Sequence, residues 1–262
     1  MKIAIIDVDS ICFTIGNPNK VLDHLGLPIK EDGKFLYTDK TESELAESAD
    51  YWMNKILEDC KCTHYIAFIK GTNTIKSRLE INPDYKGNRK KETPTWWKFC
   101  KQYLIEKWGA IEAHGAESDD YVNITRLQLK DSFIVAIDND LLNLEGTHYN
   151  WKKNLWVTVD AKTAKYEFWK DMLTGQPGDN IKGIPKVGDK TAARILTIEP
   201  YSGVVLDQYI KHFGEELGIK EFYKNYFSLR ILDTYANFAI PEPIEYKTPT
   251  IEDELTKYLE GR

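Results

Sequence analysis

The sequence predicts an α/β fold with a twisted, mostly parallel central sheet, helices on both faces, and a helical helix-hairpin-helix subdomain after it. Over the first two thirds of the chain, short apolar runs alternate with segments of helical periodicity, as in parallel sheets. The last third is mostly helical in pattern and begins with a doubled glycine–proline turn. We expect residues 1–175 to form the α/β core, and residues 176–262 to form a helical subdomain with an extended tail.

Strands are expected where apolar residues run together, at residues 3–6, 65–69, 110–113, 133–137 and 156–159. Helices are expected where apolar residues recur at helical spacing, at residues 41–57, 95–108 and 117–129 and from residue 163 onward. In an open parallel sheet, a binding site lies at the carboxyl ends of the strands. The residues that follow the predicted strands are therefore the first candidates for function.

Composition is that of a globular protein, with 42% hydrophobic and 29% charged residues. The sequence lacks the roughly 18 consecutive apolar residues of a membrane span, so no membrane association is expected. The segment Met1–Asp7 becomes acidic too soon for a signal peptide. Four cysteines do not make a disulfide framework in a chain of this size. We expect reduced thiols in a cytoplasmic protein.

The net charge of −6 is unevenly distributed along the chain. The segment from Lys70 to Lys107 carries +6 and the segment from Lys182 to Arg194 carries +3, so the remainder carries −15. Basic segments beside a strongly acidic remainder are typical of a protein that binds a polyanion next to a metal-binding cluster of carboxylates.

The stretch from Thr174 to Ala193 turns at several glycines and prolines and then enters a helix near Asp189. A glycine-rich turn before a helix offers unpaired N–H groups that suit a phosphate. Four basic residues surround the turn, at Lys182, Lys186, Lys190 and Arg194. The pattern predicts that this segment binds the backbone of a nucleic acid without contacting the bases. A helix-turn-helix corner with solvated lysines is the alternative.

Acidic residues follow several of the predicted strands and turns: Asp7, Glu117, Asp119, Asp120, Asp138, Asp140 and Asp179. On one edge of a sheet their mutual repulsion would raise their pKa values unless cations were present. Oxygen ligands without His or Cys favour Mg²⁺ or Mn²⁺. Two such ions about 4 Å apart can activate water for phosphodiester hydrolysis. For any single pair of these acids, helix capping is the alternative.

Four motifs resemble the 5′-nuclease (flap endonuclease) family, which includes bacteriophage 5′–3′ exonucleases and the 5′-nuclease domain of bacterial DNA polymerase I. They are Tyr85–Arg89, Gly115–Asp120, Asp138–Asp140 and Gly178–Ile184, and they come in the family's order over residues 1–200. The ending Thr248–Leu255 is similar to that of a phage exonuclease, which would place the protein in the cytoplasm of a host cell.

The resemblance implies two bound Mg²⁺ or Mn²⁺ ions. Asp7, Glu117 and Asp119 would hold one ion, and Asp120, Asp138, Asp140 and Asp179 would surround the second. A basic arch near residues 70–108 would cross the site. On it, the catalytic residues Lys86 and Arg89 would contact the scissile phosphate, and Tyr85 would stack on a base.

The resemblance also implies DNA contacts on the arch, at Lys70 and Lys90. In the helix-hairpin-helix, the expected contacts are Lys182, Gly183, Lys186, Gly188, Lys190 and Thr191, with a monovalent cation such as K⁺ on the carbonyls. Two positions depart from the family. Ile69 and Lys70 stand where an Asp is usual, and Gln176 stands where the first acid of an Asp-X-X-Asp is usual. We expect weaker metal binding as a result.

The predicted function is that of a structure-specific 5′–3′ exonuclease and flap endonuclease of DNA replication, acting as a monomer on DNA with a 5′ end or flap, or on RNA in hybrids. Two alternatives are open. A DNA-junction-binding protein of the same fold with weakened catalysis would fit the two missing acids. A phosphatase would use Asp7 and Asp9 as nucleophile and acid, but would leave the basic arch unexplained.

Overall fold

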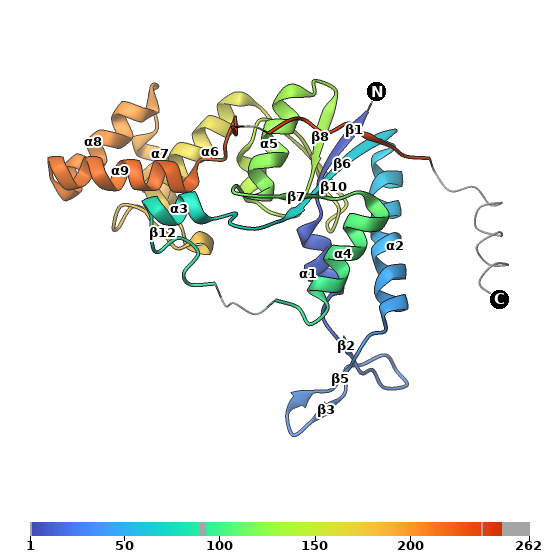
Figure 1. Cartoon of the computed structure of the whole chain (residues 1–262). Helices are drawn as coiled ribbons and strands as arrows, with labels where there is room; N and C mark the ends of the chain where they lie inside the picture. The colour runs from blue at the N-terminus through green and yellow to red at the C-terminus, as the bar shows by residue number, and fades with distance from the viewer. Residues whose placement is uncertain (1, 90–92, 237, 248–262) are drawn as a thin grey trace.

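A seven-stranded sheet forms the centre of the computed structural model, which describes residues 2–89, 93–236 and 238–247 (Figure 1). The strand order is β10-β9-β8-β1-β6-β13, and β7 pairs with β6 beside β13. The strands are β1 (Ile3–Asp7), β6 (His64–Lys70), β7 (Ile111–Ala113), β8 (Ser132–Val135), β9 (Gly146–Asn150), β10 (Leu155–Val159) and β13 (Ile244–Glu245).

Most of the strand pairs are parallel. β1 pairs in parallel with β6 and β8, and the pairs β6–β7 and β8–β9 are parallel too, whereas β9–β10 and β6–β13 are antiparallel. In this register Asp7 lies opposite Phe68, and Ile6 lies opposite Val135. The carboxyl ends of β1, β6 and β8 therefore meet at one edge, and the predicted α/β fold is confirmed.

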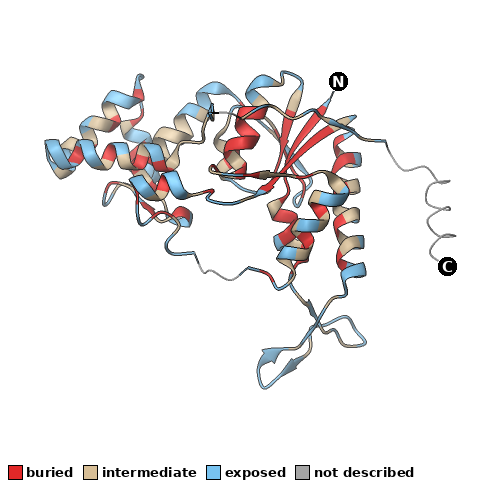
Figure 2. Ribbon diagram, in the orientation of Figure 1, coloured by how far each residue is buried: buried red, intermediate tan, exposed pale blue. Residues whose placement is uncertain are grey.

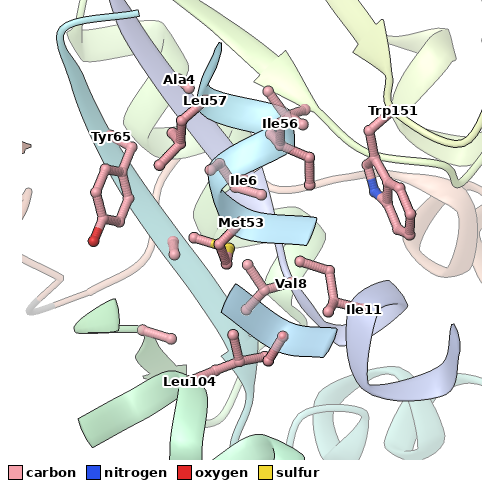
Figure 3. Packing of buried hydrophobic residues seen from close by; sticks show 14 of the residues in the cluster. Ala4, Ile6, Val8, Ile11, Met53, Ile56, Leu57, Tyr65, Leu104 and Trp151 are labelled. Atoms are coloured by element: carbon pink, nitrogen blue, oxygen red, sulfur yellow. The ribbon is translucent and has the colours of Figure 1, made fainter. Parts of the chain in front are cut away.

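Helices cover both faces of the sheet. On one face, α1 (Asp9–Ile15), α2 (Glu42–Cys60) and α4 (Trp97–Trp108) pack against Ala4 and Ile6 of β1. Figure 3 shows these two residues beside Met53 and Leu57 of α2. On the other face, α5 (Ser118–Gln128) packs against Ile5. Alternate residues of β1 thus face opposite layers, and the central strands are buried along their length (Figure 2).

Local sequence signals set the ends of α2. Thr41 and Glu44 form a capping box at its start, in which the Glu44 N–H donates to the Thr41 hydroxyl at 3.2 Å and Glu44 accepts the Thr41 N–H at 2.7 Å. The helix ends at Lys61, which adopts a left-handed conformation with a φ of 49°. The predicted helix at residues 41–57 is therefore present and three residues longer at its end.

An arm between α1 and α2 was not predicted. It consists of two small antiparallel pairs, and Figure 1 shows it projecting away from the sheet. Its strands are β2 (Asn19–Lys20), β3 (Lys30–Glu31), β4 (Lys34–Phe35) and β5 (Tyr37–Thr38). The pairs are two residues long and exposed, so no buried alternation marks them in the sequence.

The last third of the described chain is helical, as predicted. α6 (Ala161–Thr174), α7 (Asp189–Ile195), α8 (Tyr201–Phe213) and α9 (Glu215–Leu229) share a hydrophobic cluster of their own. Met172 and Leu173 of α6 belong to this cluster, although they lie before the predicted boundary at residue 175. The two-domain division stays a prediction.

Two glycines make the turn between α6 and α7 possible. Gly175 begins β11 (Gly175–Gln176), which pairs with β12 (Ile181–Lys182) around a 3-10 turn, η2 (Pro177–Asp179). Gly175 has a φ of +78°, and a Cβ on Gly183 would lie 2.2 Å from the carbonyl carbon of Thr174. Only glycines permit this crossing of the backbone.

Within the described ranges, no helix is long and apolar enough to cross a membrane. The four cysteines are free and buried. Lys90 and the segment Thr248–Leu255 lie outside the described residues.

Candidate active site

The predicted acidic residues lie at the carboxyl edge of the sheet and at the turn beside it. Asp7 ends β1 and is 6% exposed, and Asp138 follows β8. We call the full set of seven the acidic cluster: Asp7, Glu117, Asp119, Asp120, Asp138, Asp140 and Asp179. Glu117 caps α5, whose first turn carries Asp119 and Asp120, while Asp179 lies in η2.

Several members of the acidic cluster lie close enough to raise one another's pKa. Burial raises the pKa of Asp7 well above its usual value, and the charges of Asp9 and Asp138 raise it further. Burial likewise raises the pKa of Asp119, and the charges of Asp7, Glu117 and Asp138 raise it further. Four members of the acidic cluster, Asp7, Glu117, Asp119 and Asp138, thus act on one another, and Asp9 joins them although it was not among the predicted acids.

Asp140 connects this group to the hairpin turn. Burial raises its pKa to about 7, with smaller contributions from the charges of Asp138 and Asp179. The side-chain amide of Gln176 donates a hydrogen bond to Asp140. Gln176, one of the two departures from the family pattern, therefore lies beside the acidic cluster but adds no negative charge to it.

Three basic side chains of the arch neutralise part of the acidic cluster. Lys86 forms ion pairs with Glu117 and with Asp179, the latter at 3.6 Å. Arg89 pairs with Asp179. The third cation is Arg78, which was not singled out in the sequence. Lys86 and Arg89 thus lie beside the acidic cluster and contact carboxylates there, and their contact with the scissile phosphate stays a prediction.

Arg78 is a buried residue of α3 (Lys76–Ile81), a helix that the sequence pattern did not reveal. Its two terminal nitrogens each donate to one oxygen of Asp120 at 2.8 Å, and Nη1 lies 2.9 Å from Oε2 of Glu117. Nη2 also donates to the carbonyl of Arg230, at 3.0 Å. Arg78 therefore connects the base of the arch to α5 and to the end of α9.

Asp120 has no exposed surface, and its oxygens are engaged within the protein. Besides Arg78, it accepts the N–H of Glu117 at 3.0 Å and the N–H of Leu232 at 2.9 Å. Asp120 is thus held by hydrogen bonds from Arg78 and from two backbone N–H groups of the fold. Its predicted role as a metal ligand stays a prediction.

Tyr85 lies inside the site and is 3% exposed. Its hydroxyl is 2.8 Å from Oε2 of Glu117 and 2.9 Å from Oδ2 of Asp179, and it can donate its proton to either. Burial raises the pKa of Tyr85, and the charges of Glu117 and Asp179 raise it further. Stacking of Tyr85 on a base stays a prediction, and in this structure its hydroxyl contacts Glu117 and Asp179.

The acidic cluster therefore has two parts. Glu117, Asp120 and Asp179 are paired with arginine and lysine, whereas no described Lys, Arg or His side chain pairs with Asp7, Asp119, Asp138 or Asp140. Oxygen ligands with unbalanced charge suit Mg²⁺ or Mn²⁺. As they stand, however, no three His, Cys, Asp or Glu side chains of the described chain are close enough together to hold one ion. The chemistry of these oxygen ligands suits a divalent cation, and their side chains would have to rotate to bind one.

The end of β6 carries the second departure from the family pattern. Ile69 is completely buried, while Lys70 is exposed and its N–H donates to Oδ2 of Asp9 at 3.0 Å. The sequence suggests Asp9 only as the acid of a phosphatase, whereas its contacts place it beside the acidic cluster. Its spacing of two residues from Asp7 was the available signal.

The helix-hairpin-helix presents its basic residues to solvent. Lys182, Lys186 and Lys190 are exposed, and Gly188 precedes α7 as its N-cap. Thr191 is partly buried, and its N–H donates to the carbonyl of Gly188 at 2.9 Å. These positions match a surface for phosphate contact, but their predicted DNA contacts stay predictions.

A cavity of about 290 Å³ lies between the acidic cluster and the helical region. Its walls include Lys86, Glu117 and Asp179 from the site and Phe168 and Tyr226 from α6 and α9. The site is thus open to a ligand from the side of the helical region.

The chain has sequence relatives among polymerases and exonucleases, although no protein-family model matches it. It is similar to DNA polymerase I of Bacillus caldotenax, with 26% identity over 220 residues, which are 74% of this chain and 23% of the polymerase. It is also similar to a 5′–3′ exonuclease of Mycoplasmopsis pulmonis, with 28% identity over 138 residues, which are 45% of this chain and 46% of the relative. The chain thus spans less than half the length of these relatives.

In fold, the chain is similar to the flap endonuclease of bacteriophage T5 in a complex with DNA and metal ions. The TM-score is 0.64 and the identity 14%, and the match covers 87% of this chain and 90% of that one. The resemblance to the 5′-nuclease family is confirmed. On the 5′-nuclease fold, the acidic cluster and the arch lie together at one end of the sheet, next to the helix-hairpin-helix.

Proposed function

We propose that this protein is a metal-dependent 5′–3′ exonuclease and flap endonuclease that hydrolyses phosphodiester bonds of DNA. The observation that carries the proposal is the set of unpaired carboxylates, buried at Asp7, partly buried at Asp119 and Asp140 and exposed at Asp138, beside the cationic side chains Lys86 and Arg89. The relatives in sequence and fold, which are polymerases and nucleases, support it.

Asp7, Asp119, Asp138 and Asp140 would hold the divalent cations, with Glu117 and Asp179 joining them once their basic partners move. Bound Mg²⁺ or Mn²⁺ would supply a nucleophilic water at neutral pH and neutralise charge on the leaving oxygen. The protein's own part is to present fixed carboxylates at the end of a rigid parallel sheet.

Lys86 and Arg89 would exchange their carboxylate partners for phosphate oxygens of the substrate. Lys86 is held close to the reacting region because its N–H donates to the carbonyl of Asp179 at 2.8 Å. Its ammonium group has only to swing from Glu117 to an incoming phosphate. There, both cations would stabilise the negative charge that develops during hydrolysis.

The helix-hairpin-helix would hold the duplex part of the substrate. Lys182, Lys186 and Lys190 would contact phosphates without reading bases, and a K⁺ ion on the turn carbonyls would extend this contact. We propose DNA with a 5′ end or flap as substrate, RNA in hybrids as a further one, and a monomer in the cytoplasm as the active form.

The test is cleavage of a 5′-labelled flap by the natural chain and by Asp138→Asn, with Mg²⁺ and with a chelator. We expect the natural chain to release product only with Mg²⁺. Asp138→Asn should lose cleavage, because it removes a carboxylate of the acidic cluster. It should still bind the flap, because every basic residue is unchanged. Asp207→Asn, on α8, is the matched control and should cleave normally.

Two outcomes would contradict the proposal. Cleavage by Asp138→Asn at the natural rate would remove the assignment of the metal site. Tight flap binding by the natural chain without any product would favour the DNA-junction-binding protein, the alternative suggested by the positions Ile69, Lys70 and Gln176.

A further inference from the structure

Asp9 places an additional carboxylate next to the acidic cluster. It is the first residue of α1, and its N–H lies 3.4 Å from Oδ1 of Asp7. Its charge is one of the two that raise the pKa of Asp7. The two carboxylates are therefore close neighbours at the end of β1.

One oxygen of Asp9 is held by two other parts of the fold. Oδ2 accepts the N–H of Lys70, at the end of β6, at 3.0 Å. The hydroxyl of Ser118, the first residue of α5, lies 3.4 Å from the same oxygen. Three elements thus fix the orientation of this carboxylate.

The other oxygen, Oδ1, is buried and has no hydrogen-bond partner among the described residues. A buried polar atom without a partner costs about 1–3 kcal/mol, and a charged group costs more. Neither neighbouring lysine compensates by an ion pair. Lys70 is exposed, and the Lys101 ammonium is engaged by Glu112 at 2.5 Å and by the carbonyl of Lys70 at 2.6 Å.

We propose that Asp9 is a further ligand of the divalent cation held by Asp7, with Oδ1 as the ligand atom. The proposal rests on the proposed function, because it concerns the same metal site. It also gives that site a negative charge at the end of β6, where Ile69 and Lys70 supply none. The fixed Oδ2 would leave Oδ1 available to the cation without reorganisation of the backbone.

The test is direct Mn²⁺ binding to the full chain without DNA, measured by electron paramagnetic resonance of free Mn²⁺. Asp9→Asn keeps the shape and an oxygen acceptor for the Lys70 N–H but loses the charge. We expect its Kd for Mn²⁺ to rise about tenfold or more. The matched control is Asp160→Asn, which also removes a carboxylate at a helix start, where Asp160 accepts the Thr163 N–H at 2.7 Å. Its Kd should be unchanged.

Three results separate the possibilities. If Asp9→Asn binds Mn²⁺ as tightly as the natural chain while Asp7→Asn does not, Asp9 has only a structural role and the inference is wrong. If the natural chain binds no Mn²⁺, or Asp7→Asn binds it normally, the metal site and the proposed function fail with it. If Asp9→Asn does not fold, Asp9→Glu keeps the charge but displaces the oxygen, and a Kd equal to that of the natural chain would likewise overturn the inference.

Discussion

Arg78 offers the sharpest test of how the site is held together. Its side chain is 7% exposed, and that of its partner Asp120 is 0% exposed. Replacing Arg78 by Met keeps most of the aliphatic volume but leaves the Asp120 charge without its cation. Breaking a buried ion pair by removing one partner costs about 3–5 kcal/mol. Asp120 keeps two backbone donors, the N–H groups of Glu117 and Leu232, so we expect a loss near the lower value.

A loss of about 3 kcal/mol is a large fraction of the roughly 5–15 kcal/mol that stabilises a folded domain. Urea unfolding followed by circular dichroism would measure it. The matched control is Arg230→Met, because the pair of Arg230 with Asp233 is 41% and 54% exposed. An exposed pair of this kind contributes about 0–1 kcal/mol.

Removing the unpaired charge of Asp120 should restore part of the stability that Arg78→Met loses. The double variant Arg78→Met with Asp120→Asn is expected to be more stable than Arg78→Met alone, because the amide can still accept a backbone N–H without a buried charge. If Arg78→Met loses less than about 1 kcal/mol, the reasoning from burial and bidentate geometry is wrong.

Two further changes test the hairpin turn and a partly buried acid of α6. Gly183→Ala would place a methyl group 2.2 Å from the carbonyl carbon of Thr174, so we expect a loss of about 3 kcal/mol in thermal unfolding. Gly188→Ala meets nothing within 4 Å and should differ little; equal losses would refute the packing argument. Burial raises the pKa of Asp171 from 3.8 to about 6, so the native state binds the extra proton and stability should fall as pH rises through that window. Asp171→Asn should lack this part of the fall between pH 4 and pH 7 in urea midpoints, and parallel curves for the two chains would contradict the assignment.

Much of the core could be predicted because its signals are local. The strands at residues 3–6 and 65–69 are buried on both faces, so they appear as continuous apolar runs. β9, with the sequence GTHYN, is largely polar, and its place in the sheet depends on its pairing with β8 and β10. α3 is only six residues long and carries two basic residues, too short for a periodic pattern.

The site was predictable in its acids but not in their partners. Carboxylates after strands can be located from the sequence, because parallel strands bring their carboxyl ends together. The pairing of Arg78 with Asp120 joins residues 42 positions apart, and no local pattern encodes it. The sequence does not indicate the contacts of the Tyr85 hydroxyl with Glu117 and Asp179. These partners depend on tertiary packing.

The turn that carries Lys86 and Arg89 is fastened to η2, the turn of the helix-hairpin-helix. Asn88 donates to the carbonyl of Pro177 at 2.7 Å, Arg89 donates to that of Gly178 at 3.2 Å, and Asn180 donates back to that of Asp84 at 2.7 Å. If the proposed function holds, these hydrogen bonds join the turn that would contact the 5′ end to the region that would bind the duplex. The distance between the two would set how many nucleotides separate the cleavage position from the bound duplex. Lengthening either turn by a residue would then be expected to shift the cleavage position.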